Sequence, residues 1–199
     1  MPASRDRPKK PATRPAKKPM SEKRLRNIAV WYCQRYLVSS GKLADRLERR
    51  LWRDVADAEE RAALSAHIPA IVGDLARMGL VNDREAASAR LRTALRSGYE
   101  SGAAVTVASR GAMVGRDVVE AELAVAMTEA LPELDTGDRE PAEQELEQAV
   151  LSLKRARRGP WRSSGQDDRS RRRDAGWLQR RGFRLDAVRR ALDIDPLEE

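Results

Sequence analysis

Two stretches of the chain, about 70 residues apart, carry nearly the same pattern. Residues 109–123 read SRGAMVGRDVVEAEL and residues 179–192 read QRRGFRLDAVRRAL, so each places a basic residue and a glycine before a short helical segment. Gly111 aligns with Gly182, and Leu123 with Leu192, if the first copy holds one or two extra residues. We predict that each glycine lets the chain turn from a short second helix into a third. Because one such unit is too small to bury its own apolar face, neighbouring units must stack.

The composition predicts helices for these units. Apolar residues make up 41% of the 199 residues and aromatic residues only 4%, so the core must be built from Ala, Leu and Val. Helix formers run through the whole chain, and no stretch alternates apolar and polar residues as a strand does. We therefore expect an all-α fold in which three tandem degenerate three-helix units form an elongated, curved, solenoid-like body.

Helical spacing of the apolar residues predicts nine helices. Pro69 lies in the third and should bend or interrupt it. Ser40 is a possible N-cap of the second helix, and Asn82 or Asp83 of the fourth. The expected ranges are 21–39, from 40 onward, 58–78, 82–98, 102–110, 115–131, 142–157, 170–181 and 184–192.

These helices group into three units between charged flanking segments. Residues 1–20 hold five prolines and seven basic residues, which predicts a disordered basic arm. The three units are expected at 21–81, 82–131 and 142–193, with a linker at 132–141 and an acidic tail at 194–199. Residues 154–190 carry a net charge of +10, whereas residues 21–153 carry −4. The third unit is therefore the best candidate to bind a polyanion.

The candidate binding residues lie in this basic segment. Lys154, Arg157 and Arg158 are expected on one face of the seventh helix, and Arg169, Arg172 and Arg173 on one face of the eighth. A row of arginines can follow a nucleic-acid backbone or lie in an acidic protein groove, because each guanidinium binds phosphate or carboxylate with two hydrogen bonds. The alternative is a solvated face that serves solubility. The full set is Lys154, Arg155, Arg157, Arg158, Trp161, Arg162, Arg169, Arg171, Arg172, Arg173, Arg180, Arg181, Arg184, Arg189 and Arg190.

Two tryptophans accompany these arginines. Trp161, in the sequence GPWR, could stack on a base, or else pack over its own loop. Trp177 is expected in the core.

The residues of common catalytic and metal sites are scarce. The chain holds one cysteine, Cys33, expected to pack on an apolar helix face, and one histidine, His67, with no second ligand near it. No phosphate-binding glycine loop and no nucleophile elbow is present. We expect neither an enzyme nor a cofactor or metal site. The sequence has no apolar run of 18 residues that would predict a membrane helix and no apolar N-terminal stretch typical of a secretion signal, so we expect a cytoplasmic protein. We also expect a monomer.

The order of several motifs resembles the bacterial RecX family. AVWYCQRYLVSSGKLADRLERRL (29–51) is similar to the family's first helix and its short leucine-repeat helix. IPAIVGDLARMGLVNDREAASARLRTALRSGYESG (68–102) resembles its central signature. SRGAMVGRDVVEAEL and QRRGFRLDAVRRALD resemble the segments that open the third helix of the second and third units. The resemblance covers about residues 22–193.

This resemblance implies a function that composition alone does not show. Proteins of this family bind the filament that the RecA recombinase forms on single-stranded DNA, lie in its helical groove, and inhibit strand exchange and ATP hydrolysis. It therefore implies a non-enzymatic RecA regulator whose partners are the RecA nucleoprotein filament and single-stranded DNA. Two alternatives stay open, namely a general nucleic-acid-binding module that does not need RecA, and a scaffold with a solvated basic face.

Overall fold

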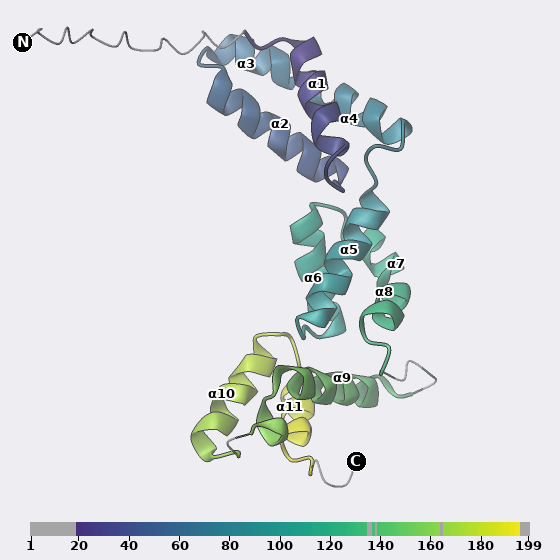
Figure 1. Cartoon of the computed structure of the whole chain (residues 1–199), viewed down its shortest axis with the longest axis vertical. Coiled ribbons are helices and arrows are strands. Elements are labelled where there is room, and N and C mark those ends of the chain that lie inside the picture. Colours follow the sequence, from purple (N-terminus) through teal and green to yellow (C-terminus); the bar gives the residue numbers. More distant parts are fainter. Residues whose placement is uncertain (1–18, 135–136, 138, 164, 196–199) are drawn as a thin grey trace, which may run out of the picture.

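The computed structural model describes residues 19–134, 137, 139–163 and 165–195, and every regular element in this part of the chain is helical. The all-α prediction is confirmed. Figure 1 shows the helices in three groups that follow one another along the long axis of an elongated, curved body. Nearly all of the predicted basic arm, and residues 196–199 of the predicted acidic tail, lie outside the described residues. No described helix combines the length and apolarity needed to cross a membrane.

The described residues form eleven α-helices and one short 3₁₀ helix rather than nine helices. They are α1 (Glu22–Cys33), α2 (Ser40–Asp54), α3 (Ala58–Ser65), α4 (Ile68–Arg77), α5 (Asp83–Arg96), α6 (Ser101–Ala112), α7 (Arg116–Ala121), α8 (Leu123–Ala130), α9 (Pro141–Ala156), η1 (Gly159–Trp161), α10 (Asp168–Gln179) and α11 (Leu185–Leu192).

The extra helices come from two interruptions. Pro69 interrupts the predicted third helix as expected, and it lies in the first turn of α4, where a missing N–H costs nothing. The predicted sixth helix also divides, because the Glu122 N–H donates to the Val119 carbonyl oxygen in a tight turn between α7 and α8. No proline or glycine marks this second break, so the sequence did not reveal it.

Two predicted helix ends were wrong. α1 ends at Cys33 rather than near Ser39, because residues 34–36 form a turn. Ser39, not Ser40, is the N-cap of α2, and its hydroxyl oxygen accepts a hydrogen bond from the Lys42 N–H. Asn82 caps α5 in the same way, as predicted.

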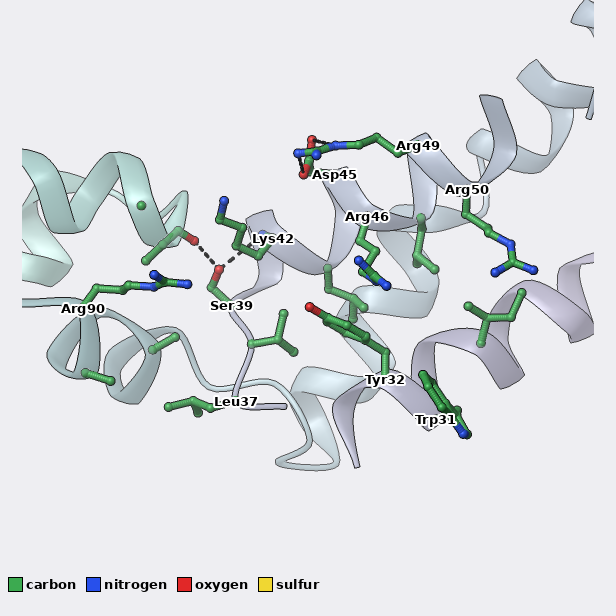
Figure 2. Close-up of a pocket in the computed structure, with 18 of the residues that line it drawn as sticks. Trp31, Tyr32, Leu37, Ser39, Lys42, Asp45, Arg46, Arg49, Arg50 and Arg90 are labelled. Carbon is green, nitrogen blue, oxygen red and sulfur yellow. Dashed lines mark hydrogen bonds and ion pairs between the residues drawn. The ribbon is translucent and has the colours of Figure 1, made fainter. Parts of the chain in front are cut away.

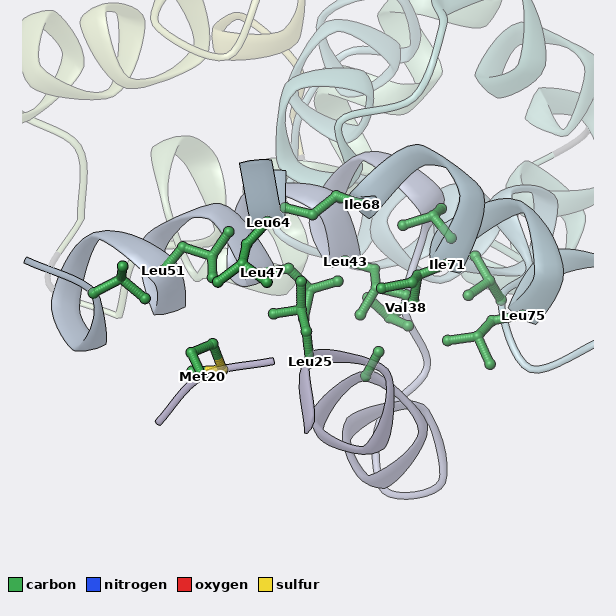
Figure 3. Close-up of a cluster of buried hydrophobic side chains, with 14 residues drawn as sticks. Met20, Leu25, Val38, Leu43, Leu47, Leu51, Leu64, Ile68, Ile71 and Leu75 are labelled. Atoms are coloured by element: carbon green, nitrogen blue, oxygen red, sulfur yellow. The ribbon is translucent and has the colours of Figure 1, made fainter. Parts of the chain in front are cut away.

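Three hydrophobic clusters form the core, one in each group of helices. The first joins α1–α4 around leucines that α2 presents four residues apart, Leu43, Leu47 and Leu51 (Figure 3). The second is built mainly from alanine and leucine of α5–α8, and the third from α9, α10 and α11. The first two groups contain four helices and the third contains three, so the description of three repeated three-helix units stays a prediction.

The two similar sequences each span the turn before a helix, but their glycines occupy different structural positions. Gly182 has φ +97° in the turn before α11. Gly111 lies inside α6, and Met113 takes the left-handed conformation instead, with φ 54°. Met113 and Gly182 each precede the next helix by three residues. The prediction of a turning glycine is therefore correct for Gly182 and wrong for Gly111.

A tight joint connects the first and second groups. The Ser39 hydroxyl donates to the Ala112 carbonyl oxygen at the end of α6. The Ser40 N–H donates to Oδ1 of Asp83 at 2.6 Å. Beside them, a Cβ on Gly41 would stand 2.2 Å from the carbonyl oxygen of Met113, so only glycine fits there. This joint fixes α2 against α6.

We expect Gly41→Ala to lower the free energy of unfolding by about 1–3 kcal/mol, because the methyl group must push backbone apart. The matched control is Gly73→Ala in α4, where the nearest atom to a new Cβ is 3.7 Å away at the end of an arginine side chain. That change should be neutral or stabilising by about 0.5 kcal/mol, since alanine favours helix. Urea unfolding of both variants measures the difference, and equal stabilities would show that α2 and α6 are not in close contact.

Candidate functional site

Four of the predicted arginines form an exposed row along α10. Arg169, Arg172 and Arg173 on α10 and Arg180 at its C-cap share one helix face through spacings of three, four and seven residues, and none forms an ion pair with a described residue. We call them the α10 arginine row. The helix begins with a capping box in which Asp167 and Ser170 bond each other's backbone N–H groups. Hydrogen bonds from the Ser170 side chain and backbone hold the pKa of Asp167 below its usual range.

Several other predicted residues are engaged with carboxylates of the same molecule. The Arg155 guanidinium lies 2.6 Å from Glu133, and that of Arg184 lies 2.6 Å from Glu145. Arg171 pairs with Asp193 and also donates to the Leu192 carbonyl oxygen at 3.2 Å. Arg190 lies 3.9 Å from Asp186. The first three pairs join neighbouring segments, and all four reduce the positive charge that the third group offers to a partner.

Asp174 gathers two further predicted arginines inside the fold. Its side chain is fully buried and accepts hydrogen bonds from Arg158 at 2.8 Å, from Arg162 at 2.8 and 2.9 Å, and from the Gly159 N–H at 2.9 Å. Burial alone would raise the pKa of Asp174, but these hydrogen bonds outweigh it and hold the pKa below its usual value. The loop after α9 is therefore fastened to α10 by this carboxylate.

Arg181 connects the third group to the second. Its guanidinium lies 3.9 Å from the Trp177 ring centroid and 5.5 Å from that of Tyr99, and its Nε–H donates to the Ser97 carbonyl oxygen at 3.1 Å. Trp177, expected in the core, is half-buried at the edge of the third cluster, and Arg181 covers part of its ring. Trp161 is also half-buried and packs against the third cluster.

The remaining predicted residues are exposed but scattered. The prediction that Lys154, Arg157 and Arg158 share one helix face is wrong, because α9 ends at Ala156. Arg157 takes a left-handed backbone conformation with φ 52°, and Arg158 turns towards Asp174. Arg189 lies exposed on α11. The predicted set therefore divides into the α10 arginine row, arginines paired with nearby carboxylates, a half-buried pair around Asp174, the contact made by Arg181, and single surface residues.

The structure also presents a basic groove that sequence reasoning missed. It lies where α1 and α2 meet α5 and the end of α6, and its volume is about 1100 Å³ (Figure 2). We call it the N-terminal groove. Seven basic side chains and one acidic side chain, Asp45, line it. The basic residues are Arg24, Lys42, Arg46, Arg49, Arg50, Arg53 and Arg90.

A signal for this groove is present in the sequence. Five of its basic residues recur along α2 at three- and four-residue steps, from Lys42 to Arg53, and so share one helix face. The opposite face carries the buried leucines. Arg90 comes from α5 and completes the groove only because the joint holds the first two groups together.

The cysteine and the histidine both lie in the first helix group. Cys33 is half-buried against the first cluster, where burial raises the pKa of its thiol. His67 is exposed at the start of α4, with its Nδ1 3.5 Å from a carboxylate oxygen of Glu22. Within the described ranges, no group of three or more His, Cys, Asp or Glu side chains could hold a metal ion.

Comparison with known proteins gives one match over nearly the full length. The chain is 28% identical to "Regulatory protein RecX" of Myxococcus xanthus (strain DK1622) over 200 residues, which cover 98% of this chain and 100% of that protein. No family model matches the sequence, and no solved structure matches it significantly. The motif order in the sequence and the all-helical fold agree with this end-to-end similarity, which supports the resemblance to the RecX family.

Proposed function

We propose that this protein regulates the RecA recombinase, mainly as an inhibitor, by binding in the groove of the RecA filament on single-stranded DNA. The observation that carries the proposal is the end-to-end similarity to a regulatory protein named RecX. The regulation is non-catalytic: the bound protein suppresses ATP hydrolysis and strand exchange by contacting the filament.

The shape and the charge of the molecule suit this role. An elongated, curved body can lie along a helical groove and contact more than one RecA protomer (Figure 1). The α10 arginine row supplies four exposed cations for acidic side chains or DNA phosphates. Arg158 and Arg162 form ion pairs with Asp174, so we expect them to stabilise the third group and not to contact the filament directly.

The test compares the wild-type protein with Arg169→Gln/Arg172→Gln/Arg173→Gln. Stoichiometric wild-type protein should suppress the DNA-dependent ATPase and strand exchange of RecA. The triple variant should need at least tenfold more protein for half-inhibition, because three charged contacts are lost. The matched control is Arg77→Gln/Arg84→Gln/Arg116→Gln, which removes the same charge from arginines that pair with Asp74, Glu122 and Glu120. The control should inhibit within threefold of wild type.

Two results would contradict the proposal. If wild-type protein leaves both RecA activities unchanged, the protein is not a RecA regulator. If the α10 triple variant loses affinity for bare single-stranded DNA as strongly as for the filament, a general nucleic-acid-binding module is the better description.

A further inference from the structure

The N-terminal groove holds positive charge that the described residues do not neutralise. Lys42, Arg46 and Arg90 form no ion pair with any described residue. They come from two helix groups, α2 and α5, and Figure 2 shows Lys42 and Arg90 near Ser39, with Arg46 further along the groove. Bringing such like charges together opposes folding, so an anionic partner would relieve their repulsion.

The other cations of α2 are only partly compensated. Arg49 pairs with Asp45. Arg50 and Arg53 share a single carboxylate, Asp54, at 2.5 and 3.2 Å. Three guanidinium groups of α2 therefore share two carboxylates, of which only Asp45 lines the groove, and the groove as a whole keeps a large positive excess.

Aromatic rings lie among these cations. Trp31 is 49% exposed although its ring is large and apolar, and it lines the groove. The Arg35 guanidinium covers part of the ring at 4.3 Å from the centroid. Tyr32 lies beneath Arg46 at 4.4 Å and beside Tyr36, so it supports the Arg46 side chain (Figure 2). Trp31 is thus the ring available for stacking.

The dimensions fit an extended ligand. At about 1100 Å³ the groove is larger than most small-molecule pockets, which span roughly 300–1000 Å³. The basic face of α2 runs from Lys42 to Arg53, which is on the order of 16 Å at the helical rise. Small residues, Ala86, Ala89 and Gly111, line the side opposite α2 and leave room for a chain to pass.

We propose that the N-terminal groove binds single-stranded DNA directly, with Lys42, Arg46 and Arg90 on the phosphates and a base stacked on Trp31. Cations that follow a backbone, together with an aromatic ring that accepts any base, are the physical requirements of single-strand binding without sequence preference. The inference does not rest on RecA regulation, because the site requires no second protein.

The exposed Trp31 ring favours a single strand over a duplex. A duplex keeps its bases stacked, so Trp31 would gain nothing from it. An RNA strand would offer 2′-hydroxyls in addition, so a comparison of oligo-U with oligo-dT distinguishes the two kinds of single strand. An acidic protein segment would also use the cations, and failure of the protein to bind oligo-dT would assign the groove to such a partner instead.

The experiment measures binding of a fluorescent 20-nucleotide oligo-dT to the full-length protein without RecA. Lys42→Gln/Arg46→Gln/Arg90→Gln should weaken binding at least tenfold and reduce the salt slope by about two units, as expected for three lost phosphate contacts on a single strand. Arg77→Gln/Arg84→Gln/Arg116→Gln removes the same charge outside the groove and should bind within threefold of wild type. Trp31→Ala should weaken binding about fivefold or more, whereas Trp31→Phe should keep most of the affinity. Circular dichroism confirms that each variant is folded.

Four results would overturn the proposal. The groove variant could bind oligo-dT like the control, or Trp31→Ala could bind like wild type. A duplex of the same length could bind as tightly as the single strand, which would exclude stacking as a source of affinity. Oligo-U could bind tenfold more tightly than oligo-dT, which would assign the groove to RNA. None of these results bears on RecA inhibition, so the two proposals fail separately.

Discussion

Replacing Asp174 by alanine is expected to lower the free energy of unfolding at pH 7 by about 3 kcal/mol, the cost of breaking a buried ion pair. The buried carboxylate accepts hydrogen bonds from Arg158, Arg162 and the Gly159 N–H, and its loss leaves all three donors without their acceptor. The loop after α9 would then separate from α10. Denaturant unfolding followed by circular dichroism measures the loss.

A matched control separates burial from charge. Asp193→Ala removes a carboxylate of the same helix group that pairs with Arg171, but the Asp193 side chain is 61% exposed. That change should cost less than about 1 kcal/mol, as exposed ion pairs do. If the free energy of unfolding falls by less than about 1 kcal/mol in both variants, Asp174 does not anchor the third group.

The pH dependence gives a second measurement of the same residue. The folded-state pKa of Asp174 lies below its unfolded value, so the native state favours the ionised form. Its stabilising contribution is therefore complete above the unfolded carboxyl pKa of about 4 and is lost as the pH falls through the lower folded value. The stability gap between wild type and Asp174→Ala should narrow on acidification from pH 7 to pH 3. A constant gap would mean that packing, not charge, accounts for the loss.

Helix type and approximate position could be predicted because they depend on neighbouring residues. The four-residue leucine spacing of α2, the Asn82 cap and the interruption at Pro69 are all local signals. The break at Glu122 was missed because no breaker residue marks it. It depends on α7 and α8 packing separately on α5, which is a tertiary effect.

Which arginines are free could not be predicted from the sequence. Arg184 pairs with Glu145, which lies 39 residues away, and Arg155 pairs with Glu133, 22 residues away. Only the fold brings such partners together. The net charge of +10 for residues 154–190 therefore overstates what this segment offers to a partner.

The N-terminal groove was missed for the opposite reason. Residues 21–153 carry a net charge of −4, which conceals a local concentration of cations. Acids of the second group are engaged elsewhere: Glu122 with Arg84, and Glu129 with Arg92. Charge summed along the chain cannot separate two faces of a helix, whereas the spacing of the basic residues on α2 can.

Gly182→Ala is the second change from which we expect a large effect, a loss of about 3 kcal/mol in the free energy of unfolding. Gly182 has φ +97°, where alanine is strained, and a Cβ there would stand 2.5 Å from the Cβ of Ala103 on α6. The neighbouring Arg181 carbonyl oxygen accepts from the Glu100 N–H at 2.9 Å, so the clash falls on the joint between the second and third groups. Thermal and urea unfolding measure the loss.

Gly79→Ala serves as the control for backbone strain, because Gly79 has φ +73° but nothing lies within 4 Å of a new Cβ. It should cost only about 1 kcal/mol, and the difference between the variants measures the contact with Ala103. The double variant Gly182→Ala/Ala103→Gly removes the clash and should recover part of the loss, although glycine inside α6 costs about 1 kcal/mol. Equal losses for Gly182→Ala and Gly79→Ala would show that the turn before α11 does not press on α6. This contact would then not fix the angle between the second and third groups, and other contacts would have to keep the elongated body rigid.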